Sequence, residues 1–190
     1  MNLLIRAVQI IDASSPFHLQ IKDILVKDGI IVSIRHHIDA DRETEIFNAE
    51  GMSVSPGWFD LYAHLCDPGY EYKEDIVSAS KAAAAGGFTG IAALPDTKPV
   101  IDSKSGIEYI LNKARGQIVD IFPIGAVTKG CEGKELAEMY DMAAAGAIAF
   151  SDAQHPIAEA GLMMRGLLYV KKIGSVIIHY PHDDSLAPHG

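Results

Sequence analysis

The spacing of apolar and polar residues divides the chain into two parts with different patterns. In residues 1–52 the apolar residues occur in short β-rich runs, and Lys27-Asp28-Gly29 is a turn signal between two of them. These runs lie at positions 3–5, 8–11, 21–27, 30–34 and 46–49. No run in this part is long enough for an ordinary helix. We therefore expect a small antiparallel β module at residues 1–52, ahead of a larger α/β region at residues 53–190.

Strand and helix patterns alternate along residues 53–190. The expected strands are residues 58–65, 88–94, 118–127, 147–150 and 175–178, and the expected helices are residues 74–85, 103–115, 133–145 and 158–173. The run at 88–94 is apolar almost throughout, which is typical of a strand buried on both faces of a parallel sheet. The alternation predicts an α/β fold with a parallel sheet and right-handed crossovers.

Two architectures agree with this order of elements. One is a doubly wound open sheet, and the other is the N-terminal part of a (β/α)8 barrel of the TIM type. No G-x-G-x-x-G sequence follows an expected strand, so the pattern gives no support to a dinucleotide site. A barrel would need its later strands to cover the open sheet edges, either from a longer chain or from a partner.

Composition narrows the function classes further. The chain has 190 residues, of which 48% are hydrophobic and 22% charged, and its net charge of −9 with scattered basic residues argues against a nucleic-acid surface. No apolar run approaches the roughly 20 residues that span a bilayer, and we find no signal peptide pattern. Cys66 and Cys131 form no C-x-x-C pair, which agrees with a reducing compartment. We therefore expect a cytoplasmic protein that binds neither nucleic acid nor membrane.

Polar residues that could carry chemistry collect where the expected strands end. Tyr62, His64 and Cys66 follow the first strand of the α/β region, and Asp96 and Thr97 follow the second. In parallel α/β folds the carboxyl ends of the strands form one edge, where chemistry is placed. The candidate residues are His64, Asp152, His155, His179 and His182, with Asp60, Asp96, Asp183 and Asp184 as carboxylate partners.

Two interpretations of these candidates stay open on the residues alone. His64, His179, His182 and Asp152 could hold a zinc ion, which needs about three protein ligands in a catalytic site. Alternatively, each of them is a hydrogen-bonded polar residue at a strand end. Neither H-x-H nor H-E-x-x-H is present, and no G-x-S-x-G sequence indicates serine chemistry.

Three stretches of the chain resemble dihydroorotases of the amidohydrolase superfamily. They are PGWFDLYAHLCDPGYEYKEDIVSASKAAAAGGFTGIAALPDTKPVID, GAVTKGCEGKELAEMYDMAAAGAIAFSD and the final HYPHDDSLAPHG. The resemblance extends over essentially the whole chain. It implies a barrel rather than an open sheet, preceded by a small β-sandwich module that is built from both ends of a longer chain. It also implies that residues 53–190 are the first part of the barrel, without its later strands.

The resemblance also shows where the metal ligands of the family are replaced. In the family the first strand ends in D-x-H-x-H-x-R, whose two histidines bind the metal; here these positions are Tyr62 and His64. The family segment F-[ST]-D-D-G, whose second aspartate bridges the metals, falls on Asp152 and Ala153. The family histidine of H-C-E-D falls on Tyr180. Of the ligand positions in this chain, only His64 is intact.

The positions that contact substrate in the family are replaced as well. The arginine of D-x-H-x-H-x-R, which holds the substrate carboxylate, falls on Cys66, and the asparagine of M-P-N-T falls on Asp96. Losing the arginine removes a bidentate clamp, and a carboxylate at position 96 adds repulsion. No catalytic or substrate-binding residue of the family is therefore expected to be intact in this chain.

These replacements lead to three hypotheses. The first is a dihydroorotase-like protein of pyrimidine biosynthesis without dihydroorotase activity and without a cofactor, which is a structural partner of aspartate transcarbamoylase and a homo-oligomer. The second is an active zinc-dependent dihydroorotase or related cyclic amidohydrolase, with Asp152, His179 and His182 as alternative ligands beside His64. The third is a sensor that binds a pyrimidine intermediate in the same cleft.

Overall fold

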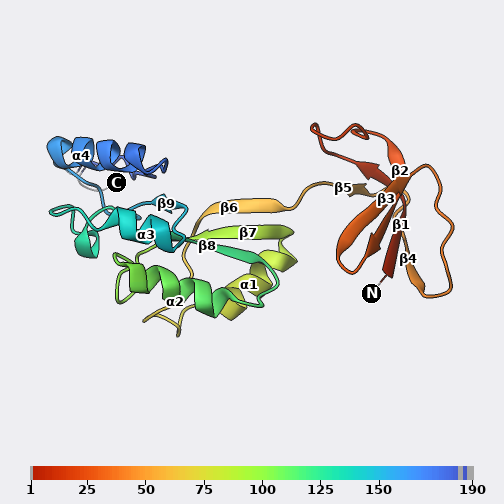
Figure 1. Ribbon diagram of the computed structural model, residues 1–190, viewed down its shortest axis with the longest axis horizontal. Helices are drawn as coiled ribbons and strands as arrows, with labels where there is room; N and C mark the ends of the chain where they lie inside the picture. Colours follow the sequence, from red (N-terminus) through yellow and green to blue (C-terminus); the bar gives the residue numbers. More distant parts are fainter. Residues whose placement is uncertain (1, 184–185, 188–190) are drawn as a thin grey trace. The chain divides into compact units, whose positions relative to one another are not determined.

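The chain folds into two units, which are described separately (Figure 1). The structure is a computed structural model and describes residues 2–183 and 186–187. The first unit comprises Met1–Pro56 and the second Gly57–Gly190. The short strand Ser53–Val54 pairs with the first strand of the chain, so the first unit extends past residue 52.

The first unit is a five-stranded mixed β-sheet. Its strands are β1 Asn2–Ile10, β2 Ile21–Lys27, β3 Ile30–Arg35, β4 Thr44–Asn48 and β5 Ser53–Val54. The order is β3-β2-β1-β4, and β5 also pairs with β1. β1 and β3 are antiparallel to β2, whereas β4 and β5 run parallel to β1. The expectation of an antiparallel module is therefore wrong for β4 and β5, because alternation of apolar residues carries no information on strand direction.

A bulge in β1 explains why the sequence pattern divides it into two runs. The pairing with β2 shifts between Ile5 and Val8, and Ala7 has a φ of 56°. The buried carboxylate of Asp23 accepts hydrogen bonds from the backbone N–H groups of Ala7 at 2.9 Å and Ile38 at 3.0 Å. The bulge returns apolar side chains to the packed face, where Val8, Ile10, Ile24 and Ala49 form the core of the unit.

The second unit alternates strands and helices, as the sequence pattern predicts. Its strands are β6 Trp58–Ala63, β7 Phe88–Ala93, β8 Asp120–Gly125 and β9 Ala149–Phe150. Its helices are α1 Ile76–Ala85, α2 Lys104–Ala114, the short 3-10 helix η1 Lys129–Cys131, α3 Met139–Ala145 and α4 Ala160–Lys172. The four strands are parallel and lie in the order β6-β7-β8-β9, which confirms the α/β fold.

Two expected elements of this unit differ most from the structure. The helix expected at 133–145 begins only at Met139, because the preceding residues form a loop in which Lys129 donates to the Glu135 carbonyl and Ala137 to the Val127 carbonyl. Gly133 has a φ of +67°, which is not compatible with the interior of a right-handed α-helix. The strand expected at 175–178 is reduced to a single bridge between Ile177 and Phe150.

The helices pack on one face of the parallel sheet. One core cluster contains residues from all four α-helices together with alternate strand residues such as Ile91 and Ile121. The cluster on the other face contains Ala92, Leu94, Ile124, Ala149 and Ala153, and no helix contributes to its described residues. A doubly wound sheet carries helices on both faces, whereas a barrel carries them on one. The sheet therefore has the arrangement of a half-barrel. Among the described residues, no helix has the length and apolar composition needed to cross a membrane.

Candidate functional site

Three of the expected site residues lie together at the ends of β6 and β7. His64 follows β6, and its Nδ1 lies 2.8 Å from Oδ2 of Asp96, which follows β7. The ring of Tyr62 meets the ring of His64 edge to face, with 5.8 Å between their centroids. We call Tyr62, His64 and Asp96 the strand-end group. Because Nδ1 of His64 is oriented by a carboxylate, Nε2 is directed away from that hydrogen bond.

The hydroxyl group of Tyr62 is buried without a hydrogen-bond partner among the described residues. The ring packs against the helix-free core cluster, which is the cluster around Ala92 and Ile124 on the sheet face without helices. Asp60 Oδ1 accepts the Tyr62 backbone N–H at 2.9 Å. Burial, and then the charges of Asp96 and Tyr180, raise the pKa of Tyr62 above 10. The phenol is therefore neutral at physiological pH. An unsatisfied buried hydroxyl destabilises the folded state by about 1–3 kcal/mol.

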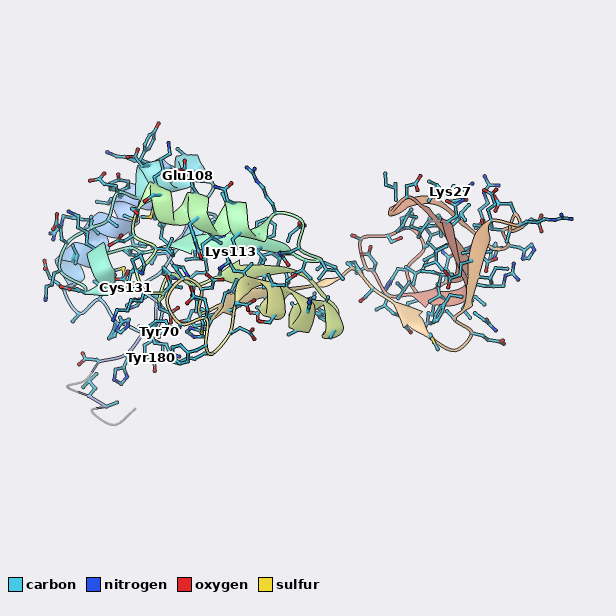
Figure 2. The ribbon with its side chains drawn as sticks, turned by 90° about the horizontal axis from the view of Figure 1, so that it is seen from below. Lys27, Tyr70, Glu108, Lys113, Cys131 and Tyr180 are labelled. Atoms are coloured by element: carbon cyan, nitrogen blue, oxygen red, sulfur yellow. The ribbon has the colours of Figure 1, made fainter. Side chains whose placement is uncertain are left out.

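Asp152, the second carboxylate expected at the strand ends, is committed to a different hydrogen-bond network. It is 4% exposed, and its Oδ1 accepts the backbone N–H groups of Val127 at 2.8 Å and Thr128 at 2.9 Å, while Oδ2 accepts the Thr128 hydroxyl. Burial raises the pKa of Asp152, and it likewise raises that of the neighbouring Cys131 thiol, which belongs to the last residue of η1 and is labelled in Figure 2. We call Asp152, Val127 and Thr128 the Asp152 network. It holds the loop after β8 against the end of β9.

The remaining candidates differ in burial and in their contacts. Ala153 is buried in the helix-free core cluster and offers no ligand atom, and His155 is exposed. His179 is exposed, whereas the rings of Tyr180 and His182 lie 5.7 Å apart. Asp183 is exposed, and Asp184 lies outside the described residues.

These side chains do not fit a zinc ion. Among the described residues, no three of histidine, cysteine, aspartate and glutamate lie close enough to hold a metal ion together. The alternative set of His64, Asp152, His179 and His182 is therefore not assembled in this chain. A neutral phenol is a poor zinc ligand, and both Asp152 oxygens already accept hydrogen bonds. Among the described family ligand positions, only His64 keeps the family's residue type.

The two family positions for substrate also lack the chemistry to bind a carboxylate. Cys66 has a φ of 59° and is half-buried, and its carbonyl accepts the Tyr70 N–H at 2.8 Å. Asp96 is paired with His64. A thiol has no fork of charged donors, and a carboxylate repels another carboxylate. Neither Cys66 nor Asp96 therefore supplies a charged donor that could hold an acidic substrate.

A second buried network fixes the loop after β6, and sequence analysis did not identify it. Asp67 is fully buried, and its carboxylate accepts from Lys113 Nζ at 2.6 Å, Tyr109 OH at 2.8 Å and Ile76 N at 3.3 Å. Hydrogen bonds to Asp67 and then to Tyr109 raise the pKa of Lys113, which Figure 2 labels on α2. We call Asp67, Tyr109 and Lys113 the Asp67 network. The only signal in the sequence is the spacing of Tyr109 and Lys113, four residues apart on one helix face.

The loops after β6 and β7 contact each other through a glycine. A Cβ atom at Gly69, whose φ is +94°, would lie 2.0 Å from the carbonyl oxygen of Lys98. Lys98 in turn donates its N–H to the Pro68 carbonyl at 3.0 Å. Only glycine allows this approach. The two loops that carry Cys66 and Asp96 are thus held in a defined arrangement, although the side chains of a metal site are missing.

Solved structures with a similar arrangement include two hydantoinases and a dihydroorotase. The L-hydantoinase of Arthrobacter aurescens matches 92% of this chain and 39% of its own, with a TM-score of 0.76 at 22% identity. A D-hydantoinase from Thermus sp. matches with a TM-score of 0.70 at 26% identity, covering 92% of this chain and 39% of its own. A dihydroorotase structure matches 93% of this chain and 50% of its own, with a TM-score of 0.63 at 14% identity. The fold is that of the amidohydrolases.

Sequence similarity narrows the assignment to one family. Residues 51–190 match the family described as dihydro-orotase-like. The dihydroorotase of Citrifermentans bemidjiense is 44% identical over 191 aligned residues, covering 100% of this chain and 45% of that protein. The dihydroorotase of Ruminiclostridium cellulolyticum is 40% identical, covering 100% of this chain and 44% of that protein. The chain belongs to the dihydro-orotase-like family, and it spans less than half the length of these curated relatives.

Proposed function

We propose that this chain is the first part of a (β/α)8 barrel, with a β-sandwich module ahead of it, in a dihydroorotase-like protein of pyrimidine biosynthesis that does not hydrolyse dihydroorotate. The protein acts through its shape and surface, as a structural partner of aspartate transcarbamoylase. It forms homo-oligomers in the cytoplasm and needs no metal cofactor. The half-barrel sheet and the family match support the fold, and the composition of the strand-end group supports the loss of activity.

The observation that carries this proposal is the environment of Tyr62. At the position where the resemblance places a metal-binding histidine, the chain has a neutral phenol whose hydroxyl is buried without a partner among the described residues. In metal-dependent hydrolysis the ion lowers the pKa of a bound water from about 15.7 to about 7. One imidazole, a phenol and a methyl group at the ligand positions supply too few donors to hold an ion for this step.

The proposed partnership is tested in cells. Deleting the protein is expected to destabilise aspartate transcarbamoylase, which would be followed by size-exclusion chromatography and by its activity in extracts. Restoring the protein with His64 changed to alanine is expected to rescue the transcarbamoylase fully, because assembly does not depend on the strand-end group. Recovery of a stable transcarbamoylase from the deletion strain would contradict the partnership.

A second candidate function is an active zinc-dependent dihydroorotase or related cyclic amidohydrolase, and one observation favours it. The Nδ1 atom of His64 lies 2.8 Å from the Asp96 carboxylate. Metal-binding histidines usually donate their second ring nitrogen to such a partner, which orients the ligand. If this function holds, His64→Ala abolishes hydrolysis of dihydroorotate and condensation of carbamoyl aspartate. The exposed His155 is the matched control, and His155→Ala would leave both rates unchanged.

A further inference from the structure

A lysine of the first unit is buried beside a histidine instead of a carboxylate. Lys22 on β2 is 6% exposed, and its Nζ lies 2.8 Å from Nε2 of His36, which directly follows β3. Its other contact is with the ring of Phe17, whose centroid lies 5.8 Å from Nζ. In the part of the chain that the structure describes, no carboxylate forms an ion pair with Lys22. A buried ammonium group normally has an anionic partner, so the imidazole takes that place here.

The Lys22–His36 pair belongs to the packed side of the sheet. Lys22 lies opposite Val8 in the register of β1 and β2, and Val8 is a core residue of the unit. His36 comes two residues after Ile34, which packs against the same core, and its contact with Lys22 shows that it points to the same side. The burial of Lys22 therefore comes from residues of the first unit itself, while the His36 ring stays open to solvent.

The short distance between the two nitrogens constrains the charges of the pair. An ammonium group only donates hydrogen bonds, so Nε2 of His36 accepts from Lys22 only while it carries no proton. A proton on Nε2 would remove the acceptor and bring two positive charges into direct contact. Even in a water-like dielectric, the repulsion at this separation corresponds to about a tenfold change in an equilibrium constant. The contact therefore tolerates one positive charge and not two.

The charged groups around the pair do not compensate for a second proton. The ionisable groups on the surrounding segments are Arg6, Asp12, His18, Asp23, Arg35, His37 and Asp39. The buried carboxylate of Asp23 accepts two backbone N–H groups and also faces Arg6 and His37. Asp39 faces His37 at 3.3 Å. These carboxylates thus have other partners, and a proton on His37 would strengthen its contacts, whereas one on His36 would break its contact with Lys22.

We propose that the Lys22–His36 pair is an acid-sensitive contact that holds the end of β3 against β2. At neutral pH the ammonium group donates to the unprotonated ring. In acid, a proton on Nε2 separates the two side chains and loosens β3, which is an edge strand of the sheet. The folded unit then binds fewer protons than the unfolded chain, so its stability falls as the pH falls. The inference concerns the first unit alone and does not depend on the proposed function.

The first test locates the ring protons of the full-length protein by proton–nitrogen NMR at about pH 7.5. His36 is expected to carry its proton on Nδ1, because Nε2 accepts from Lys22. His18 is an internal control with the opposite arrangement, since its Nδ1 accepts the Asp12 backbone N–H at 3.1 Å and its proton is therefore on Nε2. A His36 ring with its proton on Nε2, or with both nitrogens protonated, would overturn the proposal.

The second test measures how strongly the backbone N–H groups of β2 and β3 are protected from hydrogen exchange. Protection factors would be compared at about pH 7.5 and about pH 5, on either side of the ordinary histidine pKa of about 6.5. In the wild type they are expected to fall about tenfold in acid. His36→Gln offers an amide oxygen that takes no proton, and Lys22→Met removes the ammonium group, so both should reduce the fall to less than about twofold. No fall in the wild type, or an equal fall in His36→Gln, would overturn the proposal.

The matched control is His37→Gln, which removes the imidazole of the next residue. His37 faces Asp23 at 3.6 Å and Asp39 at 3.3 Å, so its proton is attracted instead of repelled. This variant is therefore expected to keep the full wild-type fall in acid. The N–H groups of β7 and β8 in the second unit are the reference for a general effect of acid. An equal fall in β7 and β8, or loss of the fall in His37→Gln alone, would contradict the assignment to Lys22 and His36.

Discussion

The buried networks around Asp152 and Asp67 differ sharply from the strand-end group that lies at the same edge of the sheet. In the two networks each buried carboxylate accepts at least three hydrogen bonds, and the loops after β6 and β8 are held by them. In the strand-end group the Tyr62 hydroxyl has no partner among the described residues, and one imidazole remains from the expected metal ligands. The polar groups that shape the site are complete, whereas those that would carry chemistry are not. The residues that hold these loops are therefore different from those at the family's metal-ligand positions.

The largest effect is expected from the Asp152 network. Asp152→Ala leaves the buried N–H groups of Val127 and Thr128 without an acceptor, each at about 1–3 kcal/mol, and should lower the free energy of unfolding by about 4 kcal/mol. Urea denaturation of the full-length protein would measure the change. Asp152→Asn keeps one carbonyl acceptor and should have about half the effect. A loss below about 1 kcal/mol for the alanine variant would show that the network does not hold the loop.

A smaller loss is expected from the Asp67 network. Lys113→Met removes the cation that pairs with the fully buried Asp67. Breaking a fully buried pair costs about 3–5 kcal/mol, and the partial exposure of Lys113 reduces the expected loss to about 2 kcal/mol. The matched control is Lys104→Met on the same helix, where the exposed pair with Glu108 should contribute less than about 0.5 kcal/mol. Equal losses of unfolding free energy in both variants would contradict a stabilising role for the pair between Lys113 and Asp67.

The same network makes stability sensitive to alkaline pH. Hydrogen bonds to Asp67 raise the folded-state pKa of Lys113 above its ordinary value of 10.5. The unfolded chain therefore releases this proton first, so the contribution of Lys113 is complete below pH 10.5 and is lost as the pH rises through the folded-state pKa. Urea midpoints measured between about pH 8 and pH 12 should fall more steeply for the wild type than for Lys113→Met. Parallel curves would contradict this assignment.

The smallest change, and one of opposite sign, is expected at Tyr62. Tyr62→Phe removes a buried hydroxyl without a partner and should raise the free energy of unfolding by up to about 1 kcal/mol. Tyr72, which is 79% exposed, is the control, and Tyr72→Phe should leave stability unchanged. The melting temperature of each variant would be compared with that of the wild type. If Tyr62→Phe destabilises the full-length protein, the hydroxyl has a partner outside the described residues, and the comparison with the Asp152 network fails.

The spacing of apolar residues predicted the parallel sheet and its helices well, because the strand pattern and the helix pattern are both strong in the second unit. Strand β7 is apolar on both faces, and α1 begins at Ile76, directly after the N-cap residue Asp75, whose carboxylate accepts hydrogen bonds from the N–H groups of Val77 and Ser78. The residues before α3 favour a helix, but the backbone N–H of Ala137 bonds to the Val127 carbonyl, and this pairing replaces the helical hydrogen bonds. Strand direction in the first unit depends on long connections, which leave no mark in the local pattern.

The sequence predicted those features of the site that depend only on where the parallel strands end. The proximity of His64 and Asp96 follows from two neighbouring parallel strands that end at one edge. The structural role of Asp152 could not be predicted, because its partners are backbone groups of Val127 and Thr128, more than 20 residues earlier in the chain. A sequence shows that a residue can be a ligand, whereas only its contacts show that its lone pairs are already in use.

The most direct test of the central claim is the zinc content of the full-length protein. The protein would be produced with zinc in the medium, purified without chelators and analysed by plasma mass spectrometry, alongside His64→Ala and the control His155→Ala. We expect trace zinc in all three proteins, because the strand-end group supplies too few ligands. Near-stoichiometric zinc in the wild type and in His155→Ala that disappears in His64→Ala would contradict it, and would establish the strand ends as a working metal site.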